Sequence, residues 1–107
     1  GLAIVCASRS YSLTLVMPET MSVERRQIMQ FLGAKVLLSS GEKGMKGAIE
    51  MSDHIAEKEG WFQPSQFRNP ANPRVHEEVT APEIWSDTEG NIDFFISGVG
   101  TGGTRSE

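Results

Sequence analysis

Apolar residues recur along this chain in blocks whose spacing alternates between short continuous runs and helical repeats. The runs at 12–17 and 34–39 are short and apolar, and Pro18 closes the first of them. Such runs are typical of buried strands. Residues 22–33 and 45–60 place apolar side chains at helical spacing, and each of these stretches ends at a glycine, the residue favoured just past a helix end. The first 60 residues therefore predict strands separated by helices.

Weaker signals continue the alternation in the second half of the chain. "WFQ" at 61–63 predicts a short strand, and "NPANP" at 69–73 predicts a turn that starts a helix. Thr80 and Glu83 have the spacing of a capping box at a further helix start. "NIDFFIS" at 91–97 predicts the last strand. The whole order predicts an α/β fold, in which crossover helices join parallel strands into a three-layer αβα arrangement.

A glycine-rich loop follows the last predicted strand. "GVGTGG" at 98–103 matches the dinucleotide-binding pattern, but the match alone is weak without a following helix and a later acidic residue. Thr101 and Thr104 flank Gly102 and Gly103, so two hydroxyls and unhindered N–H groups would converge on one point. That arrangement suits a single terminal phosphate. A strand-to-helix turn that binds nothing is the alternative.

Composition narrows the classes of function. The 107 residues carry a net charge of -4, and the absence of a basic stripe argues against a nucleic-acid partner. No apolar run approaches the roughly 20 residues that span a bilayer, so we expect no membrane partner. The single cysteine, Cys6, allows no internal disulfide and indicates the cytoplasm. His54 and His76 lack partners at metal-ligand spacing, so we expect no metal site.

Four segments, taken together and in order, give the chain a strong family resemblance. They resemble cysteine synthase, the O-acetylserine sulfhydrylase group, whose members are pyridoxal-phosphate (PLP) enzymes of fold type II, like the tryptophan synthase β chain. The segments are "MPETMSVERRQIMQFLGAKV", "GMKGAI", "QFRNPANPRVHEEVTAPEIW" and "GVGTGGT". The resemblance implies that the chain corresponds to the middle portion of such an enzyme, and hence to an incomplete part of its fold.

The resemblance also implies roles for particular residues. The cofactor's 5′-phosphate would be bound by Gly100, Thr101, Gly102, Gly103 and Thr104. Gln66 and Phe67 would line the amino-acid substrate pocket, and His76 would be structural. Residues 1–67 would form part of the small mobile N-terminal domain. Residues 68–107 would begin the cofactor-binding domain.

As function, the resemblance implies cysteine biosynthesis by PLP-dependent β-replacement, in which O-acetylserine and sulfide give cysteine and acetate. It implies a homodimer, with serine acetyltransferase as a further partner. The family's Schiff-base lysine motif would lie before residue 1, so we expect no catalytic residue in this chain and no activity of the chain alone. Two alternatives stay open: a non-catalytic truncated relative that acts as a phosphate-binding, PLP-binding or regulatory module, and half of a nicotinamide-dependent oxidoreductase.

Overall fold

The structure, a computed structural model, describes residues 1–105. The chain divides into two compact units, Gly1–Gln63 and Pro64–Glu107. The first unit holds α1 (Leu2–Ser8), β1 (Thr14–Pro18), α2 (Val23–Phe31), β2 (Lys35–Ser39), the short 3-10 turn η1 (Gly41–Lys43) and α3 (Gly44–Glu59). The second holds α4 (Ala71–Val75), η2 (His76–Thr80), α5 (Ala81–Asp87) and the 3-10 turn η3 (Gly103–Arg105).

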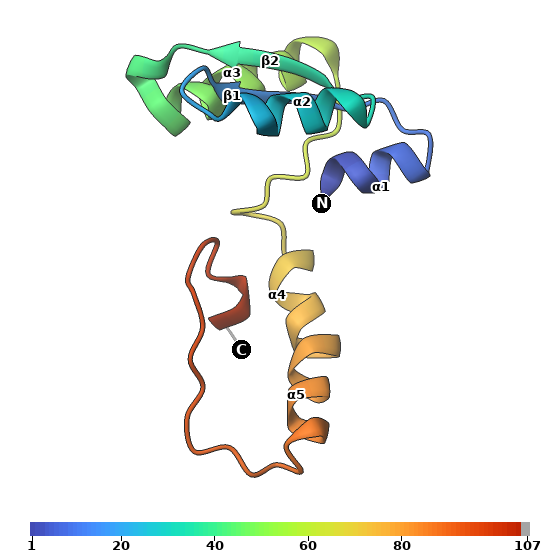
Figure 1. The fold of residues 1–107 in the computed structure, drawn as a ribbon, viewed down its shortest axis with the longest axis vertical. Helices are drawn as coiled ribbons and strands as arrows, with labels where there is room; N and C mark the ends of the chain where they lie inside the picture. The colour runs from blue at the N-terminus through green and yellow to red at the C-terminus, as the bar shows by residue number, and fades with distance from the viewer. Residues whose placement is uncertain (106–107) are drawn as a thin grey trace. The chain divides into compact units, whose positions relative to one another are not determined.

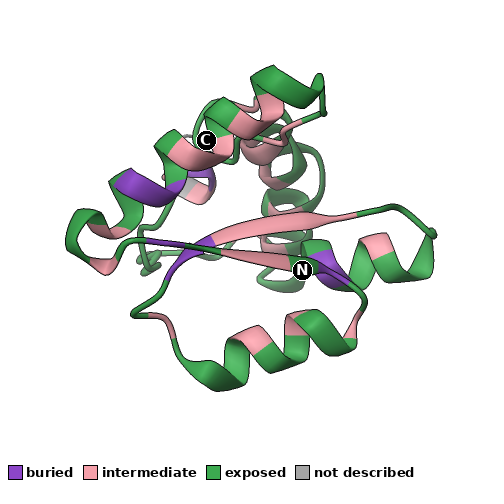
Figure 2. Ribbon diagram, turned by 90° about the horizontal axis from the view of Figure 1, so that it is seen from above, coloured by how far each residue is buried: buried purple, intermediate pink, exposed green. Residues whose placement is uncertain are grey.

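The first unit is built on a parallel pair of strands. β1 and β2 run side by side in register from Thr14 opposite Lys35 to Pro18 opposite Ser39, and α2 is the crossover between them. Helices α2 and α3 lie on opposite faces of this sheet (Figure 2). The core is small, because the buried apolar residues in the described part of the chain are Ala3, Met17, Ala34 and Ala48. The predicted α/β fold with a parallel sheet and helices on both faces is confirmed.

The two long helices end where the glycines predict. Gly33 follows α2 with φ 86°, and the N–H groups of Gly33 and Ala34 donate to the carbonyls of Gln30 and Met29. This pattern satisfies carbonyls that the helix leaves without a partner. Gly60 ends α3 in the left-handed conformation, with φ 66° and ψ 30°. The C-terminal ends of α2 and α3 were therefore predicted correctly from the sequence.

The second unit is dominated by one continuous helical stretch, α4 to α5, labelled in Figure 1. The predicted capping box is wrong, since Thr80 has helical φ and ψ of -65° and -45° and makes no capping hydrogen bond. Instead, His76–Thr80 forms a π turn in which the Ala81 N–H donates to the His76 carbonyl. Pro82 explains the wider turn, because proline has no N–H and its ring crowds the carbonyl four residues earlier.

Two predicted strands are absent from the described residues. Residues 61–63 and 91–97 have no strand pairing, and Phe62, Phe94 and Ile96 are 86%, 88% and 94% exposed. A strand exists only when a neighbour accepts and donates its backbone hydrogen bonds. Neither run pairs with a strand in the described part of the chain, so both remain irregular coil.

None of the helices in residues 1–105 has the length and apolar character that a bilayer crossing requires. Within the same residues, no group of three or more histidine, cysteine, aspartate or glutamate side chains is placed to hold a metal ion.

Candidate functional site

One cavity in the second unit brings together residues that the sequence separates. Gln66 and Phe67, expected at the substrate pocket, line it together with Thr101 and Gly103 of the glycine-rich loop. The cavity has a volume of about 170 Å³. Because residues predicted to bind substrate and residues predicted to bind phosphate border the same space, the second unit carries a candidate binding site by itself.

Asn72, near the start of α4, is the residue that joins the two sides of this cavity. Its side-chain Nδ2 donates to the Gln66 carbonyl at 3.2 Å and to the Thr101 Oγ1 at 2.7 Å. Thr101 lies 29 residues further along the chain. One amide group thus fixes the loop to the segment that carries Gln66 and Phe67.

The Gln66 carbonyl determines which way the Asn72 amide faces. A backbone carbonyl only accepts hydrogen bonds, so the amide atom beside it must be the NH₂ nitrogen. That same nitrogen faces Thr101, which must then accept the bond. A second N–H, from Gly103, donates to the same Thr101 oxygen at 3.4 Å. Because the Thr101 oxygen accepts both of these hydrogen bonds, the Thr101 proton points away from Asn72 and Gly103 and can be donated to another group.

The glycines of the loop are needed for two different reasons. Gly102 has φ 86°, a conformation that side chains disfavour. Gly103 is buried, and a Cβ placed there would lie 2.6–2.8 Å from the side-chain atoms of Asn72. Gly98 and Gly100 have nothing within 4 Å of a built Cβ. The loop therefore packs tightly against Asn72 on one side and is open at Gly98 and Gly100.

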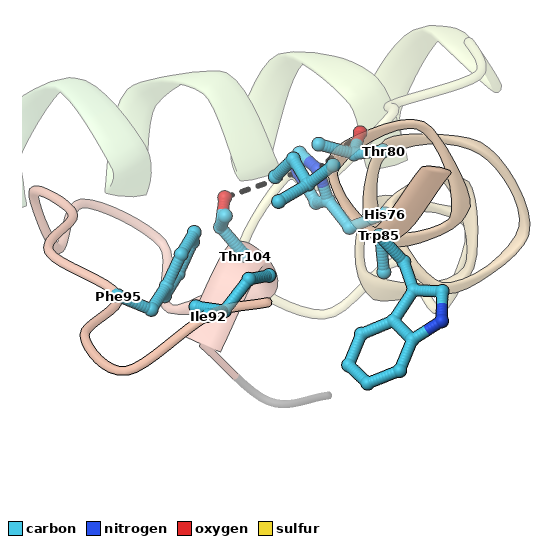
Figure 3. A pocket seen from close by; sticks show the side chains of 8 residues that line it. His76, Thr80, Trp85, Ile92, Phe95 and Thr104 are labelled. Atoms are coloured by element: carbon cyan, nitrogen blue, oxygen red, sulfur yellow. Dashed lines mark hydrogen bonds between the residues drawn. The ribbon is translucent and has the colours of Figure 1, made fainter. Parts of the chain in front are cut away.

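The second loop threonine has a different anchor. His76 Nε2 lies 3.2 Å from the Thr104 Oγ1, and His76 Nδ1 lies 3.0 Å from the Thr80 Oγ1. Figure 3 shows the Thr104–His76 contact beside an apolar cavity that Trp85 and other side chains line. The His76 imidazole connects the π turn to the loop. The π turn therefore positions His76 against Thr104.

The comparisons with known proteins are consistent across sequence and structure. A family model described as pyridoxal-phosphate dependent enzyme matches residues 1–106. The chain belongs to this family. Cysteine synthase A from Escherichia coli (strain K12) is 56% identical over 106 residues, which is 97% of this chain and 33% of that protein. The resemblance to cysteine synthase is confirmed, and the chain spans about a third of the length of the curated relatives it matches.

Solved structures give the same result. A cysteine synthase from Entamoeba histolytica superposes with a TM-score of 0.89 at 44% identity, over 96% of this chain and 31% of that one. An O-ureido-L-serine synthase superposes with a TM-score of 0.92 at 48% identity, over 96% of this chain and 33% of that one. The matched family is pyridoxal-phosphate dependent, so the alternative of a nicotinamide-dependent oxidoreductase is wrong.

The loop residues fit the phosphate monoester of the family's cofactor. Residues 98–104 contain no acidic side chain that would repel a dianion. The loop is open at Gly98 and Gly100, where backbone groups can approach a ligand without side-chain hindrance. Thr101 is held as a donor by its two N–H neighbours. The convergence of the Thr101 and Thr104 hydroxyls on one anion stays a prediction.

Sequence reasoning did not find the two residues that hold the loop. Asn72 was part of a predicted turn, and His76 was expected to be structural without a stated partner. The available signal is the repeated asparagine of "NPANP", which offers two short amide side chains soon after "QF" and is separated from it by Arg68. A single sequence contains no indication that either asparagine contacts a loop 29 residues away.

Proposed function

We propose that this chain is the middle portion of a cysteine synthase, a PLP-dependent enzyme that converts O-acetylserine and sulfide to cysteine and acetate. The observation that carries the proposal is the shared cavity of Gln66, Phe67, Thr101 and Gly103, in a chain 56% identical to cysteine synthase A. In this function, Gly100–Thr104 bind the cofactor's 5′-phosphate, and Gln66 and Phe67 line the pocket for the amino-acid substrate.

The division of labour follows from the chemistry of each group. When bound, PLP supplies an electron sink for reactions at the α-carbon of an amino acid. The loop holds the dianionic phosphate with backbone N–H groups and the Thr101 hydroxyl, and hydrogen bonds to charged groups are stronger than neutral ones. This anchoring fixes the position of the cofactor relative to Gln66 and Phe67. The residues of this chain thus contribute positioning, and the reacting lysine is expected outside it.

The proposal extends to domains, assembly and location. Residues 1–67 belong to the small mobile domain and residues 68–107 begin the cofactor-binding domain. The complete enzyme is a homodimer in the cytoplasm, with serine acetyltransferase as its docking partner. The single cysteine of the chain supports the location, because a reducing compartment needs no disulfide. The comparisons name enzymes of this group and offer no support for a non-catalytic truncated relative.

A chimera tests the proposal directly. In this chimera, residues 1–106 of the chain replace the matching third of Escherichia coli cysteine synthase A. We expect a folded protein that binds PLP and forms cysteine from O-acetylserine and sulfide, with kcat/KM within about tenfold of the parent enzyme. The parent, prepared in the same way, is the control.

Two results would count against the function. One is a folded chimera that binds PLP but forms no cysteine, which would favour the binding-module alternative. The other is a chimera that cannot fold, because a segment so similar to the one it replaces should fit the same packing.

A further inference from the structure

Asn72 occupies a place in the site that neither the family match nor the loop motif assigns. It is half-buried, and its Nδ2 is shared between the Gln66 carbonyl and the Thr101 hydroxyl. Gly103 leaves room for the amide, because any Cβ there would overlap with Asn72. The Asn72 side chain thus has two hydrogen-bond acceptors, and it needs a glycine at position 103 of the loop.

From this geometry we propose that Asn72 is a positioning residue, which orients the Thr101 hydroxyl as a hydrogen-bond donor toward the cofactor's phosphate. The inference rests on the proposed function, since it requires that the loop binds that phosphate. Asn72 acts through Thr101 and need not touch the ligand. The same amide sets the distance between the phosphate loop and the substrate segment at Gln66.

The orientation of the Thr101 hydroxyl follows from which neighbouring groups can donate and which can accept hydrogen bonds. The Gln66 carbonyl can only accept, so it selects the NH₂ side of the Asn72 amide. The NH₂ group can only donate, so it makes the Thr101 oxygen an acceptor. The Thr101 proton is then free for an anion, and a phosphate oxygen is a strong acceptor for it. Each step follows from donor and acceptor chemistry and from the contacts at 3.2 and 2.7 Å.

Replacing the amide by a carboxylate reverses these roles at almost constant shape. In Asn72→Asp, an oxygen would face both the Gln66 carbonyl and Thr101. The Thr101 hydroxyl would donate to that carboxylate instead of the phosphate, and the added negative charge would repel the dianion. Asn72→Ala only removes the orienting group. The inference therefore ranks the aspartate variant below the alanine variant, whereas a purely space-filling role would rank them in the opposite order.

Asn69 provides a matched control within the same motif. Its Nδ2 donates to the Pro64 carbonyl at 3.0 Å, and its Oδ1 accepts from the Ala71 N–H at 2.9 Å. Neither bond reaches the glycine-rich loop. Asn69 lines the same cavity, so Asn69→Asp adds the same charge there while Asn72 keeps its bond to Thr101, and it separates the effect of the charge from the effect on the Thr101 hydroxyl.

The experiment measures the phosphate site in the chimera described above. Cofactor-free protein is titrated with PLP to give a dissociation constant, and the ³¹P resonance of the bound phosphate is recorded. We expect the dissociation constant to rise by on the order of tenfold in Asn72→Ala and more in Asn72→Asp, as for loss of a hydrogen bond to a charged group. The ³¹P shift should move in both, and Asn69→Asp should raise the dissociation constant much less than Asn72→Asp, because Thr101 keeps its amide partner.

A double-mutant cycle separates action through Thr101 from a general loss of structure. In a Thr101→Val background, the effect of Asn72→Ala on the dissociation constant should largely disappear, because the hydroxyl that it orients is gone. The inference is wrong if the Asn72→Ala effect keeps its full size there, or if Asn72→Asp binds PLP better than Asn72→Ala.

If Asn72→Asp does not fold, the Asn72→Ala and Thr101→Val cycle still decides the question. An unsubstituted chimera that forms no cysteine overturns the proposed function. An active chimera whose Asn72 variants bind PLP normally overturns only this inference.

Discussion

At the scale of single residues, the site depends on how closely Gly103 approaches Asn72. Gly103 is among the few buried positions of the described chain, although the cavity that it borders is open. A Cβ built on Gly103 would meet the Asn72 side chain, whose Oδ1, Cγ and Nδ2 atoms lie within 2.8 Å of it. Real Cβ atoms do not approach other heavy atoms so closely, so any larger residue must displace Asn72.

The Gly103→Ala substitution should therefore destabilise the chimera through Asn72. Overpacking a tight contact costs roughly 1–3 kcal/mol, and the melting temperature should fall by a few degrees. In an Asn72→Ala background, the added methyl group has room, so the further loss on Gly103→Ala should be much smaller. Calorimetry on the four proteins of this cycle checks the coupling. Equal losses in the two backgrounds would contradict the contact.

At the scale of elements, local signals succeed where a local interaction produces the structure. Gly60 ends α3 with left-handed φ and ψ, and the Trp61 N–H returns to the Ala56 carbonyl. These contacts involve neighbours in sequence, so the glycine alone predicts them. The capping box at Thr80 failed because its residues lie in the interior of a longer helix. The Thr80 Oγ1 lies 3.0 Å from His76 Nδ1, within the π turn His76–Thr80.

Gly60 offers a test of the helix end by itself. Nothing lies within 4 Å of a Cβ built on Gly60, so substitution there changes backbone strain and not packing. Gly60→Ala should lower the free energy of unfolding of the chimera by about 1 kcal/mol. Gly60→Asn should cost less, since asparagine tolerates the left-handed region better than alanine. Denaturant unfolding gives both values, and a larger loss for asparagine would contradict the strain argument.

At the scale of the whole molecule, the described chain leaves much apolar surface uncovered. No large side chain in it is less than 2% exposed, and Phe31, Phe62 and Ile96 are 90%, 86% and 94% exposed. Exposed large apolar side chains mark interaction sites or aggregation where they gather into patches. The relatives are about three times as long, and we expect the remainder of such an enzyme to cover these residues.

The isolated 107-residue chain should accordingly not behave as a stable monomer. A small core and an unpaired apolar run at 91–97 provide too little burial to offset the conformational entropy of folding. We expect association in light scattering, no cooperative transition in calorimetry, and no cysteine formation from O-acetylserine and sulfide. A cooperative, monomeric melt would show that the chain is self-sufficient and that this expectation is wrong.

The sequence by itself determined the features that arise from near neighbours. Apolar periodicity placed β1, β2, α2 and α3, and glycines placed the helix ends, because helical and turn conformations depend on residues a few positions apart. The motif set determined the family in the same way, since it depends only on the order of residues. The glycine-rich loop was evident for the same reason.

Only the tertiary structure decided which residues hold that loop and which apolar runs become strands. Asn72 meets Thr101 across 29 residues, and His76 meets Thr104 across 28, and no local pattern encodes such pairs. Residues 61–63 and 91–97 have strand-like sequences but form no strand pairing within the described chain. A strand depends on hydrogen bonds to another segment, so its presence is a property of the assembled sheet and not of the run itself.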